Sequence, residues 1–253
     1  MKIHAYRFGF VLLLVGLQAY PAFAAEYTGL VEWARRTNLS MPVSGVVARV
    51  NVNEGMRVKK GEVMLSLDQR YFDAQLASAK ATVARHKPGR DEAKKELQRS
   101  EELFERTVLS QVELDKARID YEEKQAIYRG ASASYQRAQL DKEYSELKAP
   151  YDLVVIRALV VQGQTVVNEL QATPMVEVAD AGNRLISLDA KTSDARSLQL
   201  GSMITVSSQN KNIKARVVAL DAGQERKSIH VLVLVGTKAI PGLRVGSTVK
   251  VQW

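Results

Sequence analysis

Two stretches of alternating apolar and polar residues frame the central part of the chain. The first, PVSGVVARVNVNEGMRV, begins at Pro42, and the second, PYDLVVIRALVVQGQTV, begins at Pro150. Their valine spacing is typical of β-strands, and Gly55 and Gly163 are placed for turns. A shift of 108 positions superposes Pro42 on Pro150, Val46 on Val154, Val47 on Val155, Arg49 on Arg157, Val52 on Val160, Gly55 on Gly163 and Val58 on Val166. This repeat predicts that the two stretches are halves of one β domain, separated in the sequence by the residues between them.

The residues between the two halves follow a heptad pattern, which is typical of helices that pack as a coiled coil. One apolar series comprises Phe72, Leu76, Ala79, Val83, Ala93, Leu97 and Phe104, with His86, Arg90 and Ser100 interrupting it. The other comprises Leu114, Ala117, Tyr121, Tyr128, Ala131, Tyr135 and Ala138. We expect two antiparallel helices of about 35 residues, projecting roughly 50 Å at ~1.5 Å per residue.

The chain turns between these helices at the segment RTVLSQVELDKA. Ser110, with Glu113 three residues later, predicts a capping box at the start of the second helix. Asp68 is the expected N-cap of the first helix. Antiparallel helices bring Asp68 back to Lys148, so the two half motifs can pair into one β sandwich with the hairpin inserted at its edge.

Pro88 lies within the first predicted helix. Proline has no backbone N–H, and its ring clashes with the preceding helical turn. Gly130 lies at nearly the same height on the returning helix. The sequence therefore predicts a kink or a break of the hairpin at this level.

Short alternating runs from Arg184 to Trp253 predict β structure throughout the last part of the chain. The segments LQLGSMITV and LRVGSTVKV superpose at an offset of 45, with Gly201 on Gly246. Such a pair is expected of a small barrel built from related halves. The predicted fold class is α+β, multidomain and elongated.

The first residues have the pattern of a secretory signal peptide. Lys2 and Arg7 precede an apolar run that is shorter than the about 20 residues of a transmembrane helix, and AFA ends at Ala24. We expect cleavage after residue 24 and an exported, soluble mature protein. No cysteine follows the cleavage site, so no lipoprotein anchor is expected.

Composition argues against several other classes of protein. The net charge is +8, but the segment from Arg70 to Leu147 holds 15 basic and 15 acidic side chains, and no basic stripe for nucleic acid is visible. There is no cysteine for a disulfide or a thiolate metal site. No histidine is expected to lie near a serine and an acidic partner, so hydrolytic chemistry is not expected. Met41, Met56 and Met64 are expected in the core of the β domain rather than at a metal site.

The sequence resembles the HlyD-type periplasmic adaptors, or membrane fusion proteins, of RND-type and related tripartite efflux systems. GVVARVNVNEGMRVKKGEVMLSLD is similar to the first half of their lipoyl-like domain, and LKAPYDLVV with VVQGQTV is similar to the second half. The family usually has glycine where this chain has Leu153. The resemblance implies a lipoyl-like β sandwich with an inserted antiparallel coiled-coil hairpin, followed by a β-barrel. The expected ranges are 1–24 for the signal peptide, 25–40 for an N-terminal strand or linker, 41–68 and 148–180 for the lipoyl-like halves, 69–147 for the hairpin and 181–253 for the barrel.

Adaptors of this kind that meet a TolC-type outer-membrane channel carry Arg, Leu and Ser at a fixed spacing across the hairpin end. Arg99, Leu103 and Ser110 stand at that spacing, so the resemblance implies that they contact the channel. The alternative is that Arg99 is a solvated helix charge, Leu103 part of the helix seam and Ser110 a helix cap.

The resemblance implies an adaptor that oligomerises, as a trimer or hexamer, into a sleeve between an inner-membrane transporter, RND type first, and the outer-membrane channel. It implies no catalytic residue, cofactor or metal. An adaptor of an ABC-type or type I secretion exporter is the alternative, and a lipoyl or biotinyl carrier a remote one, since Gln69 and Arg70 stand where carriers place the modified lysine. The membrane-proximal domain of larger adaptors is not expected, so docking to the transporter would use the barrel and lipoyl-like surfaces.

Overall fold

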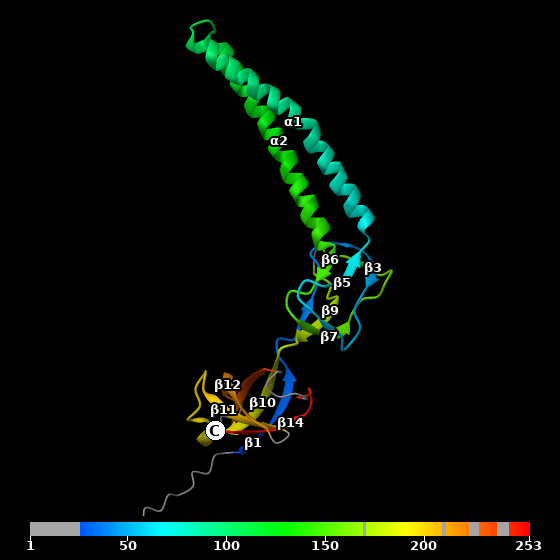
Figure 1. Ribbon diagram of the computed structural model, residues 1–253, viewed down its shortest axis with the longest axis vertical. Coiled ribbons are helices and arrows are strands. Elements are labelled where there is room, and N and C mark those ends of the chain that lie inside the picture. Colours follow the sequence, from blue (N-terminus) through cyan, green and yellow to red (C-terminus); the bar gives the residue numbers. More distant parts are fainter. Residues whose placement is uncertain (1–25, 169–170, 209–210, 223–227, 237–242) are drawn as a thin grey trace, which may run out of the picture.

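The computed structural model describes residues 26–168, 171–208, 211–222, 228–236 and 243–253. The predicted signal peptide lies outside these residues. A helical hairpin, a β sandwich and a β-barrel follow one another along the long axis of the molecule (Figure 1). The fold class is therefore the predicted one, an elongated multidomain α+β chain.

The β sandwich consists of two four-stranded sheets, ordered β2-β9-β7-β4 and β6-β5-β3-β8. Its strands are β2 (Thr37–Leu39), β3 (Gly45–Val50), β4 (Arg57–Val58), β5 (Val63–Leu67), β6 (Glu146–Lys148), β7 (Leu153–Ala158), β8 (Thr165–Val166) and β9 (Val176–Asp180). Strand β3 pairs with β8, and β4 pairs with β7. Each half motif thus completes the sheet of the other half.

The hydrogen bonds that join the halves repeat with the same shift of 108 positions. Gly55 N donates to Val155 O at 2.8 Å, and Gly163 N donates to Val47 O at 2.8 Å. Both glycines have positive φ, 81° and 86°, a conformation that side chains disfavour. Leu153, where the family has glycine, is fully buried at the start of β7, so the strand continues there without a special turn.

One apolar core fills the space between the two sheets, and it draws residues from both halves. Met41 and Met64 are 2% and 0% exposed, as predicted. Met56 is 42% exposed, so its expected place in the core was wrong. The turn at Gly55 places Met56 on the outer face, and Val58, two residues later, points into the core.

The hairpin consists of α1 (Gln69–Glu105) and α2 (Gln111–Tyr144). Its buried side chains are Phe72, Ala93, Ser100, Leu114, Ala131 and Ala138. The side chain of Asp68 caps α1 by accepting from Arg70 N, and hydrogen bonds from Arg70 lower the pKa of Asp68 to about 2. The predicted helices and caps are confirmed, and the predicted seam is confirmed except at Phe104, which is 38% exposed.

Pro88 does not break the first helix, because α1 runs without interruption to Glu105. The hairpin curves along its length in Figure 1. The polar residues that interrupt the apolar series still occupy the seam: the Arg90 guanidinium lies 4.3 Å from the centre of the Tyr128 ring on the facing helix. Pro88 itself is exposed, and α1 continues past it although the proline cannot make its helical hydrogen bond.

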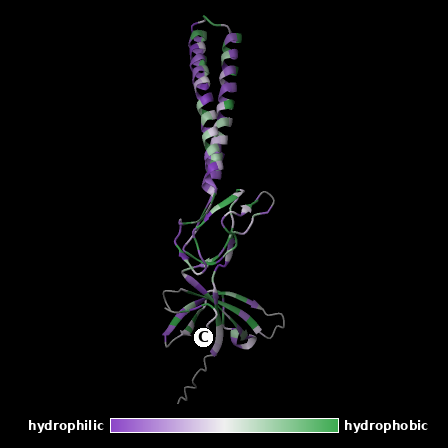
Figure 2. Cartoon of the chain, turned by 90° about the vertical axis from the view of Figure 1, so that its right-hand side faces the viewer, coloured by the Kyte–Doolittle hydropathy of each residue, from purple (hydrophilic) through white to green (hydrophobic). Residues whose placement is uncertain are grey.

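The barrel is closed in the order β1-β10-β13-β12-β11-β14, with the short helix α3 (Thr192–Ala195) after β10. Its strands are β1 (Glu26–Trp33), β10 (Asn183–Lys191), β11 (Met203–Ser208), β12 (Lys211–Ala222), β13 (Ser228–Gly236) and β14 (Thr248–Gln252). Apolar and hydrophilic residues alternate along these strands (Figure 2), so one face fills the barrel core.

Strand β1 belongs to this barrel, although the predicted barrel range was 181–253 and residues 25–40 were expected as a strand or linker. It pairs with β10 on one side and β14 on the other. At Gly29 an added Cβ would lie 2.3 Å from Ile186 Cγ2, so glycine allows β1 to approach β10. The range was wrong because strand closure pairs residues far apart in sequence.

Candidate docking site at the hairpin tip

The turn between α1 and α2 ends the first helix with a Schellman motif. Val108 N donates to Leu103 O at 3.0 Å, and Thr107 N donates to Phe104 O at 2.9 Å. Thr107 holds the left-handed position with φ 63°. Glycine usually fills this position, and a β-branched residue there is strained.

Replacing Thr107 with glycine is therefore expected to stabilise the chain. Glycine adopts φ 63° without steric conflict, and we expect the free energy of unfolding of Thr107→Gly to rise by about 1 kcal/mol. Chemical denaturation of the two proteins measures this difference. Thr107→Ala is the control, since it removes the β-branch and keeps the Cβ; equal stability of all three would contradict strain at this turn.

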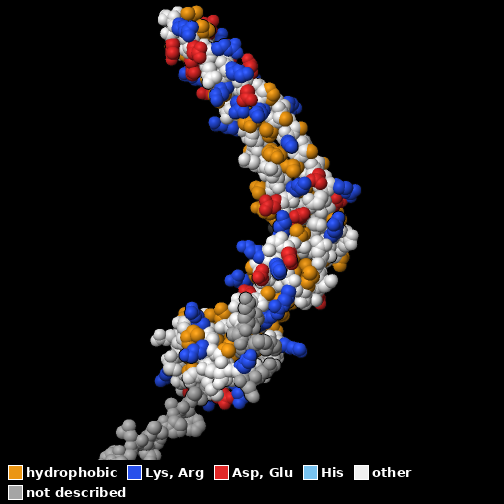
Figure 3. Space-filling view, in the orientation of Figure 1, with side chains coloured by type: hydrophobic (Ala, Val, Ile, Leu, Met, Phe, Trp, Pro, Cys, Tyr) orange, Lys and Arg blue, Asp and Glu red, His pale blue; other side chains and the backbone are white. Residues whose placement is uncertain are grey.

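Apolar side chains surround the turn and face solvent. Leu103 is 39% exposed, Phe104 38%, Val108 71% and Val112 63%. Figure 3 shows apolar side chains at this end of the hairpin, next to the mixed charges that cover its sides. An apolar cluster at the end of a long projection has no core of its own to cover it, and such surfaces are typical of protein contacts.

Arg99 lies one helical turn before Leu103 and is 60% exposed. Its guanidinium pairs with two glutamates of its own helix: Nη1 lies 3.2 Å from Glu96 Oε2, and Nη2 lies 3.3 Å from Glu92 Oε1. Such exposed pairs contribute little to stability. The guanidinium is therefore held on the outer face of α1 without being removed from water.

Ser110 forms the predicted capping box. Its Oγ accepts from Glu113 N at 3.3 Å and donates to Glu113 Oε2 at 2.7 Å, and Ser110 N donates to the same carboxylate at 3.1 Å. These hydrogen bonds lower the pKa of Glu113. The hydroxyl is thus used within the hairpin.

The three predicted residues line one end of the hairpin without forming a pocket. Arg99 and Leu103 lie on α1 and Ser110 starts α2, and no hydrogen bond or ion pair among the described residues joins Arg99 to Ser110. Sequence reasoning missed Val108 and Val112, which are the most exposed apolar residues of the tip. The sequence did hold a signal for them: both valines lie in or directly after the turn, and neither belongs to a heptad series.

The fold also brings together a serine, a histidine and an acid that lie apart in the sequence. His230 Nδ1 lies 3.0 Å from Asp189 Oδ1, and Ser187 Oγ lies 3.4 Å from His230 Nε2. The expectation that no histidine lies near a serine and an acid was therefore wrong, because β10 and β13 pair across a wide sequence gap. The Asp189 side chain is 71% exposed and that of His230 39%, so the group lies on the open outer surface of the barrel.

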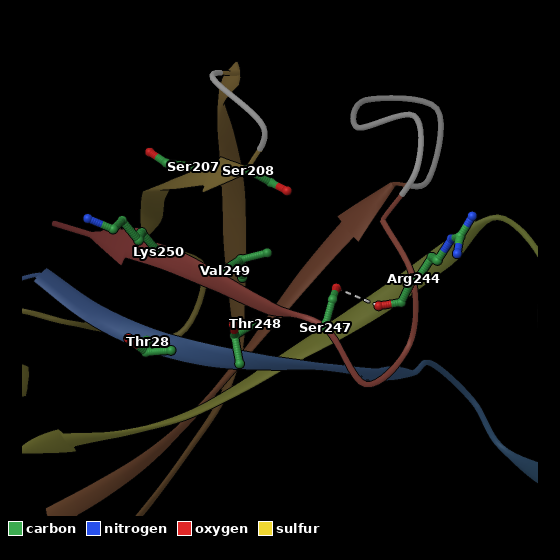
Figure 4. Close-up of a pocket in the computed structure, with 8 residues that line it drawn as sticks. All are labelled: Thr28, Ser207, Ser208, Arg244, Ser247, Thr248, Val249 and Lys250. Carbon is green, nitrogen blue, oxygen red and sulfur yellow. Dashed lines mark hydrogen bonds between the residues drawn. The ribbon is translucent and has the colours of Figure 1, made fainter.

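A shallow polar groove crosses the barrel over β1, β11 and β14. Hydroxyl groups of Thr28, Ser207, Ser208, Ser247 and Thr248 line it together with Arg244, Val249 and Lys250. Figure 4 shows Arg244 and Lys250 at opposite ends and pointing apart. Lys250 Nζ also pairs with Glu26 at 2.6 Å, so the two cationic side chains of the groove do not converge on one position.

The β sandwich, with its inserted hairpin, is the part of the chain that identifies its family. A family model described as a CzcB-like, barrel-sandwich hybrid domain matches residues 35–180, which span the sandwich and the hairpin inserted in it. The chain belongs to the CzcB-like barrel-sandwich hybrid family. The predicted resemblance to membrane fusion proteins is confirmed, and the matched range holds all three tip residues.

Two curated relatives of this CzcB-like chain are named as export or resistance proteins. The chain is 28% identical over 188 residues to the macrolide export protein MacA of Yersinia pestis, covering 69% of this chain and 51% of MacA. It is 29% identical over 133 residues to the multidrug resistance protein MdtA of Photorhabdus laumondii, covering 53% of this chain and 33% of MdtA. The chain thus spans about half of MacA and a third of MdtA.

Solved structures share the fold at lower identity. A MacA-MexA chimeric protein that contains the Pseudomonas aeruginosa MexA α-hairpin domain matches with a TM-score of 0.65 and 22% identity, over 90% of this chain and 80% of that one. The membrane fusion protein Spr0693 of Streptococcus pneumoniae R6 matches with a TM-score of 0.66 and 14% identity, over 90% and 97%. Within the described part of this CzcB-like chain, no helix is both long and apolar enough to cross a bilayer.

Proposed function

We propose that the chain is the periplasmic adaptor of a tripartite efflux pump, joining an inner-membrane transporter to a TolC-type outer-membrane channel. The observation that carries the proposal is the hairpin itself. Two helices of 37 and 34 residues project from a split β sandwich and end in exposed apolar residues. At ~1.5 Å per residue the hairpin reaches about 55 Å, which suits a spacer between two partners.

The proposed mechanism is geometric. Several copies, a trimer or a hexamer, would place sandwich and barrel side by side and bundle their hairpins into a sleeve through which substrate passes. Each copy would present Arg99, Leu103 and Ser110 to the channel. Ser110 would act mainly by fixing the start of α2, since its hydroxyl is already bonded to Glu113.

We take an RND-type transporter as the first choice of inner-membrane partner and an ABC-type or type I exporter as the alternative. The names macrolide export protein and multidrug resistance protein of the two relatives support export of small compounds. The predicted signal peptide supports a periplasmic location.

The chain acts as an adaptor and not as an enzyme in this proposal. Carrier proteins hold their lysine in the turn that joins the two lipoyl-like halves. Here β5 ends at Leu67, Asp68 caps the helix and α1 begins at Gln69, so helix α1 replaces that turn.

Deleting the gene in the source organism tests the adaptor role. We expect at least a fourfold loss of tolerance to one or more exported compounds, restored by the wild-type gene but not by a gene whose residues 1–24 are removed. The same strains are fractionated, and the mature chain is expected in the periplasmic fraction beginning at Ala25. Unchanged tolerance across a panel of macrolides, dyes and detergents would contradict the proposal.

A further inference from the structure

A hollow of about 430 Å³ lies where the β sandwich meets the barrel. Trp33 and Arg184 line it from the barrel, and Arg57 lines it from β4 of the sandwich. Gly55 and three residues of β7, Val154, Val155 and Ile156, complete the lining. The site therefore combines two guanidinium groups, an indole and an aliphatic wall.

Arg184 is a buried cation with hydrogen-bonding capacity left over. It is 5% exposed, and its guanidinium carbon lies 4.2 Å from the centre of the Trp33 ring. Nη1 donates to the backbone oxygens of Asp180 at 3.0 Å and Asn183 at 2.7 Å. The buried Nε has no hydrogen-bond partner. An unmet donor on a buried charge is costly, so the guanidinium group of Arg184 is short of acceptors.

Arg57, the second cation of the hollow, does not offset the cost of burying Arg184. Burial lowers the pKa of Arg184, the nearby charge of Arg57 lowers it further, and Asp180 acts in the opposite direction. The Asp180 carboxylate is engaged elsewhere, since it accepts from Gly182 N at 2.7 Å and from Asn183 N at 3.1 Å. Arg57 itself has no ion pair among the described residues. Two like charges thus line one hollow without a carboxylate between them.

We propose that this hollow binds a small soluble molecule with an oxyanion, carboxylate or phosphate, on a short apolar body. The oxyanion accepts from the guanidinium groups of Arg184 and Arg57, whose planar donors match carboxylate and phosphate oxygens. The apolar body packs on Val154, Ile156 and the Trp33 indole. Because Arg57 belongs to the sandwich and Arg184 to the barrel, one bound molecule joins the two domains.

The indole of Trp33 provides the readout. The chain has two tryptophans, so a Trp253→Phe background leaves Trp33 as the sole reporter, and the introduced phenylalanine retains an aromatic ring to stack on Tyr27. The probes are hexyl phosphate, hexanoate, inorganic phosphate, hexanol, and phosphatidylcholine vesicles with and without phosphatidic acid. We expect saturable binding of hexyl phosphate and hexanoate, weaker binding of inorganic phosphate, no binding of hexanol, and no preference for the anionic vesicles.

Arg57→Ala is the deciding variant, because Arg57 is exposed and, among the residues that the structure describes, makes no ion pair that supports the fold. We expect its affinity for hexyl phosphate to fall at least tenfold, with the melting temperature retained. The control is Arg49→Ala, which removes the same charge from an exposed position on the other sheet and is expected to bind as the parent does. Arg184→Gln is expected to lose binding as well, but it also removes two backbone contacts.

Three results would overturn the proposal. One is equal affinity of Arg57→Ala and the parent for hexyl phosphate. Another is binding of hexanol as tightly as hexanoate, which would make the hollow an apolar site only. The third is a response to phosphatidic acid vesicles without a response to the soluble anions, which would assign the two arginines to a membrane surface. None of these results depends on the adaptor role.

Discussion

A chain with Leu103 replaced by aspartate is expected to fold normally and to lose export. Leu103 is 39% exposed at the end of α1, so its replacement removes little buried surface and leaves the helix seam intact. In the proposed contact with the channel, the same change places a charge in an apolar interface, and every copy around the ring repeats the defect. We expect tolerance to an exported compound to fall to that of the deletion strain.

Arg99→Asp is expected to act in the same direction. It breaks the pairs with Glu92 and Glu96 and sets three acidic groups on one face of α1, which costs a few tenths of a kcal/mol in the free energy of unfolding. Because this cost is small, a loss of export would come from the contact with the channel. There aspartate removes the forked N–H donors of arginine and repels the oxygen acceptors of the partner.

The measurement is tolerance in cells, with the melting temperature of each purified variant. Leu103→Met is the control for the first change because it keeps an apolar side chain. Lys80→Asp is the control for the second, since Lys80 is an exposed charge near the base of α1. Ser110→Ala is expected to cost about 1 kcal/mol through the lost cap. Wild-type export by normally expressed Arg99→Asp and Leu103→Asp proteins would contradict the proposed channel contact of the tip residues.

Excising the hairpin is the second change with a large expected effect. The sequence alone favoured removal of residues 69–147, but Leu147 is 7% exposed in the core of the sandwich and β6 pairs with β5. The structure places the cut at residues 69–144 instead. Leu67 N donates to Ser145 O at 2.9 Å, so the cut ends lie close together and a short glycine-rich turn can join them.

This excised chain is expected to keep a folded sandwich and barrel and to lose export completely. The main structural loss is Phe72, which is 4% exposed and packs in the sandwich core, and its removal costs about 3 kcal/mol. Thermal unfolding followed by circular dichroism in the β region measures the outcome. A second chain that keeps residues 69–75 and 138–144 restores Phe72 and is expected to recover that stability, but not export.

Loss of all β signal in both excised chains would contradict a sandwich that folds without its hairpin. Retained export by either chain would instead contradict the role of the hairpin as the spacer. The two failures are separate, because the first concerns folding and the second the adaptor function.

Local patterns predicted much of this chain because they depend on neighbours in sequence. The heptads set the seam of α1 and α2, and Ser110 with Glu113 satisfies the first N–H groups of α2. The shift of 108 positions predicted the split sandwich, since residues that share a turn geometry also share their hydrogen bonds, as Gly55 and Gly163 do.

Local rules failed where packing or an unusual residue overrode them. Pro88 lies inside α1 although it cannot make its helical hydrogen bond, and Thr107 ends α1 in a conformation that glycine usually adopts. Met56 lies on the outer face, because side chains alternate between the two faces along this segment. The contact of the tip residues with a channel remains a prediction, because it depends on a second protein.

The sequence by itself determined the order of the parts: a half sandwich, two helices of nearly equal length, the other half and a run of barrel strands. Periodicity, caps and repeats encode these features locally. Only the tertiary structure decided which distant residues meet: β1 in the barrel, Ser187 and Asp189 beside His230, and Arg184 on Trp33 opposite Arg57. Strand register and domain contact set these meetings, and both result from burying many side chains together, which no single stretch of sequence records.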